Sequence, residues 1–325
     1  MSIADYLSGS LNYWQARLTR FGLPITQRPK RFHAMSNTDM LTKGVRIQRR
    51  AKDKSVVVED LLAVEEPLEI RLAYRGKQGV LASRGISITM RTPGADEELA
   101  AGFLATEGIV SSCEDIEDIS IGSGEDNSGL GLAPNIARVA LREGVDVDFE
   151  QLSRHVFTSS SCGVCGKATL EALSARGLKR IEGGGFCMTS DVLLSLPSKL
   201  LELQRTFART GGLHATALVD PSGEIIDVAE DVGRHNAMDK LLGRRFLAGE
   251  WPLSNHLILV SGRASFELVQ KALLAGVPVL AAVGAPSSLA VELADNFGMT
   301  LAGFLSDKRF NLYCRPERVE EDASS

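Results

Sequence analysis

The chain has 325 residues, of which 44% are hydrophobic and 24% are charged, and its formal net charge is −5. This length is enough for two domains of about 100–200 residues each, and the composition is that of an ordinary globular protein. No apolar run approaches the roughly 20 residues that a helix needs to span a bilayer, and residues 1–30 contain no continuous apolar segment, so we expect neither a membrane anchor nor a secretory signal.

The first stretch of the chain, residues 1–54, is basic. It carries eleven Lys or Arg and three Asp, a balance of +8 that leaves −13 for the remainder. Such an arm can indicate binding to nucleic acid or to a membrane. Pro24 and Pro29 interrupt it, however, and it shows neither a helical apolar stripe nor a nucleic-acid motif. We therefore interpret it as a flexible extension and expect no nucleic-acid or membrane partner.

Residues 55–155 predict a small β-rich domain. Runs of β-branched residues, or of alternating apolar and polar residues, are typical of strands and occur at 55–58, 67–74, 85–90, 116–121 and 136–141. One helix is expected at 96–107, because acidic residues occupy its first turn and Gly108 follows its end.

Residues 191–318 show a different rhythm, in which strands and helices alternate. Helical patterns occur at 193–210, 234–247, 266–274 and 289–296. Strand patterns, two of them almost continuously apolar, occur at 213–219, 224–228, 256–260, 277–283 and 300–304, which we take as the last strand. This alternation predicts a three-layer α/β domain, so the expected class is α/β with a smaller β-rich N-terminal domain. Residues 319–325 are expected to form a tail.

Between the two domains, residues 156–190 hold a Cys-x-x-Cys pair, Cys162 and Cys165, in a stretch rich in Ser and Gly. A helix is expected at 167–176, directly after the pair, and the positive end of a helix dipole stabilises a nearby thiolate. The chain has five cysteines, and this odd, scattered set argues against a disulfide framework and for a reducing cytoplasm. We therefore expect a reactive thiol in this segment.

Three interpretations of the pair remain open from the residues alone. Half of a zinc site would need two further ligands, and the candidates Cys187, His155 and His214 are single and distant. A thioredoxin-like disulfide should follow a strand, whereas a Ser-rich loop precedes this pair. In sulfur transfer, one thiolate carries a sulfane sulfur as a persulfide and a second thiol helps to release it. Cys113, Cys187 and Cys314 lack a partner pattern and are expected to be ordinary thiols.

Polar segments follow several predicted strands at their carboxyl ends, where open α/β sheets place their ligands. The segment 230–240 puts Arg234 and His235 in the first turn of a helix, although a helix start capped by Asp231 explains it equally well. The segments 261–265, 284–288 and 304–309 match no Walker loop or dinucleotide fingerprint. Together they offer backbone N–H groups and three cations that suit phosphates and a purine, namely Arg263, Lys308 and Arg309.

An ordered set of motifs in this chain closely resembles one family, the formate dehydrogenase accessory sulfurtransferases (FdhD). The resemblance runs from Val57 to Arg318, and the basic arm falls outside it. Its motifs are EEPLEI (65–70), RTPG (91–94), AGF (101–103), EG (107–108), SCGVCG (161–166), GLHA (212–215), DVGRHNA (231–237), SGR (261–263) and GMTL (298–301).

The resemblance implies a function that composition does not. Members of the family accept sulfur from a cysteine desulfurase and pass it to the molybdenum bis(molybdopterin guanine dinucleotide) cofactor, which formate dehydrogenase then receives. They are homodimers, and their C-terminal domain is similar to the cytidine deaminase fold. By match to the motif, the catalytic thiols would be Cys162, which carries the persulfide, and Cys165. The guanine dinucleotide site would include Phe304, Leu305, Ser306, Asp307, Lys308 and Arg309.

Zinc deaminase chemistry does not follow from this likeness of fold. A zinc deaminase requires an H-x-E motif followed by P-C-x-x-C. His214 is followed by Ala215 and Thr216, so it does not supply that glutamate, and the cysteine pair precedes the α/β domain. We expect a cytoplasmic sulfurtransferase with no permanent metal. A zinc-dependent hydrolase and a non-catalytic chaperone that binds the cofactor are the alternatives.

Overall fold

The computed structural model describes residues 41–52, 54–75, 81–123, 135–145, 147, 178–182 and 185–321. Cys162, Cys165 and the helix expected at 167–176 lie outside these residues. The chain divides into two compact units, Met1–Thr38 and Asp39–Ser325, and every described residue belongs to the second. Within the described part, no helix is long and apolar enough to cross a membrane.

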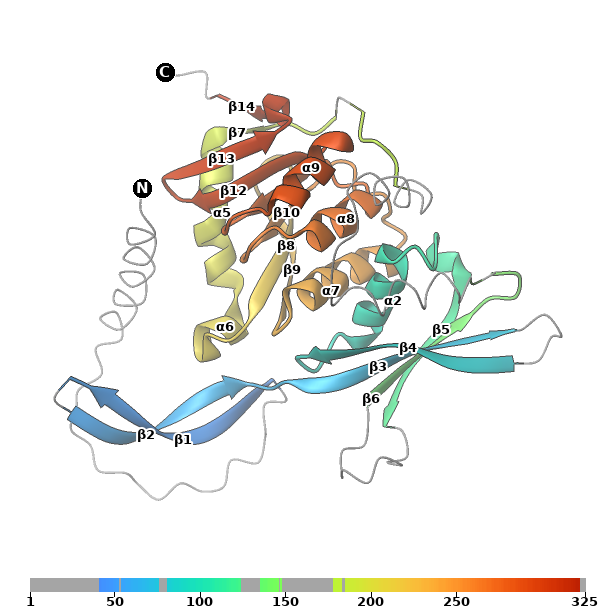
Figure 1. Ribbon diagram of the computed structural model, residues 1–325, viewed down its shortest axis with the longest axis horizontal. Helices are drawn as coiled ribbons and strands as arrows, with labels where there is room; N and C mark the ends of the chain where they lie inside the picture. The colour runs from blue at the N-terminus through green and yellow to red at the C-terminus, as the bar shows by residue number, and fades with distance from the viewer. Residues whose placement is uncertain are drawn as a thin grey trace. The chain divides into compact units, whose positions relative to one another are not determined.

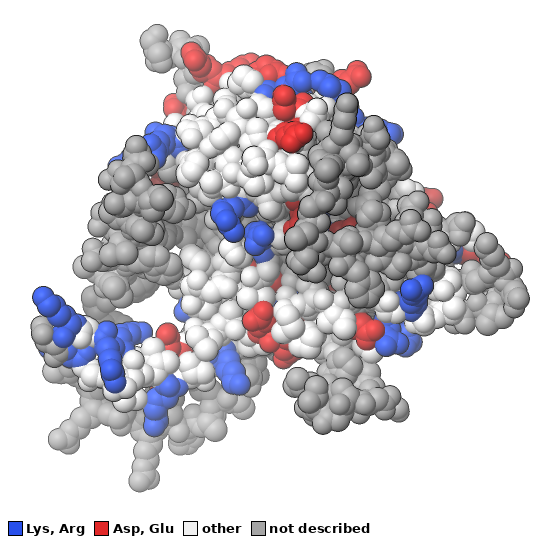
Figure 2. All heavy atoms as spheres, in the orientation of Figure 1, with Lys and Arg blue, Asp and Glu red and all other residues white. Residues whose placement is uncertain are grey.

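A two-stranded hairpin begins the described part of the chain. Strands β1 (Thr42–Ala51) and β2 (Lys54–Ala63) pair antiparallel along their whole length. The sequence predicts a flexible arm up to residue 54, and the structure differs because Val45 and Ile47 alternate with polar residues as in a strand, with Ile47 opposite Val58. Lys and Arg side chains gather along this hairpin (Figure 2).

A four-stranded sheet with the order β4-β3-β6-β5 forms the next layer (Figure 1). Its strands are β3 (Glu66–Arg75), β4 (Leu81–Arg91), β5 (Ile116–Ser123) and β6 (Asn135–Leu141). The pair β3 and β6 is parallel, and the other pairs are antiparallel. Helix α2 (Asp96–Thr106) covers the apolar face of the sheet, where Leu68, Ile70 and Leu72 of β3 are buried. A 3₁₀ turn, η1 (Cys113–Asp115), leads into β5.

A six-stranded sheet with the order β13-β12-β11-β10-β8-β9 forms the centre of the C-terminal domain. The three strands β10, β11 and β12 run parallel, and the other neighbours are antiparallel. The strands are β8 (His214–Val219), β9 (Ile225–Asp231), β10 (Leu257–Val260), β11 (Val279–Ala282), β12 (Thr300–Ser306) and β13 (Arg309–Cys314).

Helices cover both faces of this sheet (Figure 1). On one face α5 (Ser190–Leu203) packs against alternate strand residues such as Leu257 and Leu259. On the other face, Ile258 and Val260 pack against α7 (Arg234–Leu247), α8 (Phe266–Leu274) and α9 (Ser288–Asn296). This alternation of burial is what a strand buried on both sides requires, and the mixed α/β class expected from the sequence is confirmed.

Two boundaries differ from the sequence-based expectation because local patterns did not show where the chain turns. The helix expected at 193–210 is two helices, α5 and α6 (Arg205–Thr210), separated by the buried Gln204 with φ −77° and ψ 75°. The strand expected at 300–304 is not the last, because β12 continues to Ser306 and turns into β13.

The expected C-terminal tail also contains regular structure. After the 3₁₀ turn η2 (Pro316–Arg318), β14 (Val319–Glu320) pairs in parallel with β7 (Met188–Thr189). Each strand has only two residues, which is too short for a pattern of alternation to be read from sequence.

A buried ion pair fixes three helices to one another. The ammonium group of Lys271 in α8 donates hydrogen bonds to Asp239 Oδ1 of α7 at 2.9 Å and to Thr106 Oγ1 of α2 at 2.8 Å. Burial alone would lower the pKa of Lys271, but the charges of Asp239 and Glu107 outweigh it and raise that pKa. Lys271 therefore remains charged at neutral pH, and its hydrogen bonds hold α2 of the first sheet against α7 and α8 of the second.

Helices α2 and α7 approach so closely that only glycine fits where they cross. A Cβ atom on Gly243 would overlap the carbonyl oxygen of Glu98, and one on Gly102 would overlap that of Asp239. The helices must move apart to accept any side chain at either position. The pair of glycines is therefore a requirement of packing and not of turn formation.

We predict that Gly243→Ala destabilises the protein. Alanine gains up to about 1 kcal/mol in helix propensity over glycine. Overpacking a rigid contact costs typically ~1–3 kcal/mol, and here the added methyl group would meet the backbone of the facing helix. The free energy of unfolding, measured by urea denaturation, should fall. Gly122→Ala is the matched control, because a Cβ there meets nothing within 4 Å. Equal stability of the two variants would contradict the close helix crossing.

Candidate functional site

The three parallel strands end side by side, and their backbones continue as one ladder. Gly284 N donates to Gly262 O at 2.9 Å, and Phe304 N donates to Gly284 O at 3.0 Å. A further bond runs from Ser287 N to Ala264 O at 3.0 Å. The three polar segments that the sequence places at carboxyl ends of strands therefore do lie together at one edge of the sheet.

Strands β8 and β9 bring two more predicted segments to the same edge. Because β8 is antiparallel to β10, its first residue, His214, lies beside the end of β10, and a Cβ on Gly262 would be 3.2 Å from His214 Nδ1. The register pairs His214 with Asp231, so helix α7 begins at this edge. We call this edge the strand-end rim, made of His214, Arg234, His235, Gly262, Arg263, Gly284 and Phe304.

His235 is held by two neighbours through one ring nitrogen. Its Nε2 lies 2.7 Å from Glu267 Oε2 and 3.3 Å from Ser265 Oγ. The hydrogen bond to His235 is the main cause that lowers the pKa of Glu267. A Ser–His–Glu relay needs the serine and the carboxylate on opposite ring nitrogens, so this trio does not activate Ser265 and serves to orient His235.

His214 is neutral at neutral pH. Burial is the main cause that lowers its pKa, the positive charges of Arg234 and His235 lower it further, and Asp231 opposes them. The side chain is half-buried, so an anion that binds at the rim would change its environment directly.

Asp231 does not cap helix α7, which corrects one of the two interpretations of this segment. The N-cap residue is Gly233, with no side-chain cap. Asp231 is fully buried and accepts hydrogen bonds from Thr92 N at 3.1 Å, Gly233 N at 2.8 Å and Asn236 Nδ2 at 3.1 Å. Asp231 also forms an ion pair with Lys240, whose Nζ lies 2.7 Å from Asp231 Oδ2.

These contacts join the RTPG and DVGRHNA motifs into one buried hub. Lys240 Nζ also donates to Thr92 O at 2.7 Å, while Asn236 bonds Met90 O and Thr89 Oγ1. Most of the polar side chains in residues 230–240 therefore hold the two sheets together. Arg234 and His235 of that segment are half-buried and lie on the rim.

The predicted nucleotide segment forms the end of β12 and its turn into β13. Phe304 has a left-handed backbone with φ 53°, a strained conformation for a residue other than glycine. The turn is held by Ser306, which pairs with Arg309, and by Asp307 Oδ2, which accepts a hydrogen bond from Ser198 Oγ of α5 at 2.8 Å. Such strain is typical of sites where surrounding structure fixes the backbone.

The six residues of that segment are not equivalent. Leu305 is 1% exposed and belongs to the core beneath α5, so its side chain does not face a ligand. Asp307, Lys308 and Arg309 are exposed, and Phe304 and Ser306 are half-exposed. The part that can meet a ligand is thus the turn and its backbone.

Two of the described cysteines, Cys187 and Cys314, are poor candidates for a reactive thiol. Burial raises the pKa of Cys314 to about 11, and burial is also the main cause that raises the pKa of Cys187. Cys113 and Cys187 are half-buried free thiols. Over residues 41–321, excluding the gaps stated above, no group of three His, Cys, Asp or Glu side chains could hold a metal ion. Cys162 and Cys165 are not among the described residues.

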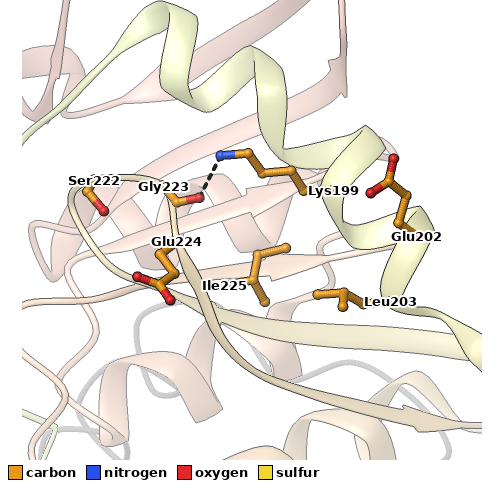
Figure 3. Close-up of a pocket in the computed structure, with 7 residues that line it drawn as sticks. All are labelled: Lys199, Glu202, Leu203, Ser222, Gly223, Glu224 and Ile225. Atoms are coloured by element: carbon orange, nitrogen blue, oxygen red, sulfur yellow. Dashed lines mark hydrogen bonds between the residues drawn. The ribbon is translucent and has the colours of Figure 1, made fainter.

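A separate cavity of about 410 Å³ was not anticipated from the sequence (Figure 3). Figure 3 shows it between α5 and the turn that joins β8 to β9, where Lys199 Nζ donates to Gly223 O at 2.8 Å. Its lining is Lys199, Glu202, Leu203, Ser222, Gly223, Glu224 and Ile225. This turn lies at the opposite end of β8 from His214, so the cavity is distinct from the strand-end rim.

Comparisons with known proteins place the chain in a family. The model of the FdhD/NarQ family matches residues 63–320. A protein from Streptomyces avermitilis named "Sulfur carrier protein FdhD" is 47% identical over 272 residues, which cover 83% of this chain and 93% of that protein. A protein of the same name from Saccharolobus solfataricus is 40% identical over 281 residues, covering 85% and 99%.

A solved structure has the same fold. The crystal structure of a candidate formate dehydrogenase accessory protein from Desulfotalea psychrophila superposes with a TM-score of 0.64 and 23% identity, and the match covers 86% of this chain and all of that one. At this identity the likeness concerns the fold. The match to the family model, together with relatives at 40% identity or more over most of the chain, shows that this chain belongs to the FdhD/NarQ family.

Proposed function

We propose that this protein is a sulfur carrier that activates formate dehydrogenase. In this proposal Cys162 accepts sulfane sulfur from a cysteine desulfurase as a persulfide and transfers it to the molybdenum bis(molybdopterin guanine dinucleotide) cofactor. The observation that carries the proposal is identity of 40–48% over more than four fifths of the chain to proteins named sulfur carriers. The cofactor is the substrate here and not a resident group.

The transfer chemistry needs a thiolate that can attack sulfur. Cys162 displaces the desulfurase thiolate from its persulfide and takes the outer sulfur atom. A second thiol nearby, Cys165, helps to release that sulfur to the acceptor. The described thiols support this assignment indirectly, because burial raises the pKa of both Cys187 and Cys314 and makes them poor nucleophiles.

The strand-end rim and the β12–β13 turn would hold the guanosine diphosphate groups of the cofactor. The support is positional: open sheets bind ligands at the carboxyl ends of parallel strands, and Lys308 and Arg309 are exposed there. The exposed side chains and the strained Phe304 backbone would make the contacts, while Leu305 supports them from the core. Tight binding of the nucleotide groups would place the molybdenum end of the cofactor close to the persulfide.

Three further parts of the proposal follow from the family resemblance. The C-terminal domain would share the cytidine deaminase fold, which a six-stranded sheet with helices on both faces supports. Zinc hydrolysis is not part of it, because His214 is not followed by the required glutamate. The protein would act in the cytoplasm as a homodimer that meets a desulfurase and formate dehydrogenase in turn.

Mass spectrometry tests the carrier step. After incubation with a cysteine desulfurase, pyridoxal phosphate and cysteine, the peptide that contains Cys162 should gain about 32 Da, which dithiothreitol removes, as expected of a persulfide. Cys113 is the internal control and should not gain mass. A stable mass gain on another cysteine, with none on Cys162, would contradict the proposed role of this residue.

A further inference from the structure

The hairpin of β1 and β2 has one apolar face that belongs to no core among the described residues. Directly opposite residues of an antiparallel pair share a face, and the register pairs Ile47 with Val58 and Arg49 with Val56. Side chains alternate between the two faces along each strand. The larger apolar side chains on this face, which we call the apolar face of the hairpin, are Val45, Ile47, Val56, Val58 and Leu62. Val56 is 51% exposed and Leu62 is 48% exposed, so apolar surface is open to solvent near both ends of this face.

The opposite face holds the hairpin against helix α6. Thr42 pairs with Ala63 at the base of the hairpin. Arg209 Nη2 of α6 donates a hydrogen bond to Thr42 Oγ1 at 3.3 Å, and a Cβ on Gly212, shortly after α6, would lie 3.6 Å from Ala63 Cβ. Since α6 lies on that side, the apolar face needs a different partner. A two-stranded hairpin is at best marginally stable in water without one.

The hairpin also carries positive charge, which gathers along it in Figure 2. Among the described residues, no carboxylate lies within ion-pair distance of its six cations, which are Lys43, Arg46, Arg49, Arg50, Lys52 and Lys54. Residues 1–63 have a balance of +6, which leaves −11 for residues 64–325, the part that we call the body. Surfaces of opposite charge attract one another, and surfaces of like charge repel. The hairpin is therefore complementary to an acidic surface such as the body of this same chain.

We propose that the apolar face of the hairpin packs against the body of a second copy of this chain. This inference rests on the homodimer of the proposed function, and it assigns the surface through which the two copies meet. Two hairpins of the same positive charge would repel each other, so each hairpin contacts the acidic body of the other copy instead. Exchange of the two hairpins around a twofold axis makes two identical contacts and closes the assembly.

The size of the apolar face is sufficient for a stable dimer. Each strand of the hairpin has 10 residues. At ~3.4 Å per residue and ~4.8 Å between strands, one face measures roughly 34 by 10 Å. Two hairpins that each cover a comparable area on the other copy would remove about 1,300 Å² from water, which is within the ~1,200–2,000 Å² of stable interfaces. A contact through the hairpins alone could therefore hold the two copies together.

Sedimentation velocity of the full chain over a range of protein concentrations tests this contact with two adjacent valines of β2. Val56 lies on the apolar face, whereas Val57, which is 65% exposed, lies on the opposite face. Val56→Asp should raise the dissociation constant of the dimer by about 100-fold, because each of the two contacts would bury an unpaired carboxylate at a cost of roughly tenfold. Val57→Asp is the matched control and should leave that constant unchanged. Circular dichroism confirms that each variant is folded.

The charge of the hairpin provides a second readout. Attraction between exposed charges is screened by salt, so the dimer of the unchanged protein should dissociate more readily as the NaCl concentration rises. Arg49 and Arg50 are adjacent exposed arginines of β1, and Arg49 shares the apolar face with Val56. Arg49→Glu should weaken the dimer and reduce its dependence on salt. Arg50→Glu, on the opposite face, makes the same change in net charge and should have a smaller effect.

The outcomes separate the inference from the proposed function. If the unchanged protein is a dimer and Val56→Asp dissociates no more readily than Val57→Asp, the copies meet through another surface and the inference alone is overturned. An unchanged protein that stays monomeric at every concentration would overturn the inference together with the proposed homodimer, and it would leave the apolar face to another occupant, such as an acidic partner protein. The sulfur carrier step stands apart from both results, because persulfide formation on Cys162 is measured separately.

Discussion

Cys162→Ala should abolish the activation of formate dehydrogenase. The alanine variant lacks the nucleophile that takes up sulfane sulfur. Cys187 and Cys314 are poor replacements, because burial raises the pKa of Cys187 and brings that of Cys314 to about 11. Activity of a formate dehydrogenase produced in cells that lack the endogenous accessory protein measures the effect. We expect loss to the level of cells without any accessory protein.

A matched series of thiol variants separates a carrier from a chaperone. Cys113→Ala, at the start of the 3₁₀ turn η1, should retain full activation. Cys165→Ala should be impaired at release and should accumulate the persulfide on Cys162. Full activation by Cys162→Ala would instead show that the protein works by binding the cofactor and the apoenzyme without carrying sulfur.

Asp231→Ala should be the most destabilising of the substitutions considered. The Asp231 side chain is fully buried, and the Lys240 side chain is 4% exposed, so the substitution leaves a buried ammonium group without its counter-charge. Removal of one partner of a buried ion pair costs typically ~3–5 kcal/mol. The same change leaves the backbone N–H groups of Thr92 and Gly233 without acceptors. Urea denaturation should show a large fall in the free energy of unfolding.

Two comparisons make this expectation specific. Glu250→Ala removes a carboxylate that is 52% exposed and 3.0 Å from Arg245, and a surface pair of this kind contributes at most about 1 kcal/mol. The double variant Asp231→Ala with Lys240→Met should recover part of the lost stability, because it removes the unpaired charge. If Asp231→Ala were no more destabilising than Glu250→Ala, the buried hub would not be a source of stability.

The hub and the rim are physically connected, which explains why the family motifs are so dense here. Asp231 fixes the backbone of Gly233, and the next two residues, Arg234 and His235, open α7 at the rim. The same carboxylate holds Thr92 at the end of β4. A change in the hub should therefore affect both stability and the proposed nucleotide binding at the rim.

Local patterns in the sequence were enough for most elements of the C-terminal domain. The helices expected at 234–247 and 266–274 have those bounds in the structure. Ser287 accepts a hydrogen bond from Ala290 N, as expected of a cap. Apolar periodicity and capping depend on residues a few positions apart, so they can be read along the chain. The resemblance to the FdhD family, which rests on short motifs in order, is confirmed.

What only the tertiary structure decided involves residues far apart in sequence. From its neighbours alone Asp231 is expected to cap a helix, whereas the structure shows it bonded to Thr92, which lies 139 positions away in the sequence. In the same way Leu305 resembles a site residue in the sequence, but α5 covers it. The pattern of the chain determined which segments form strands and helices, whereas the sheet order determined that His214, Arg234 and Gly262 meet, because long-range pairing leaves no local signal.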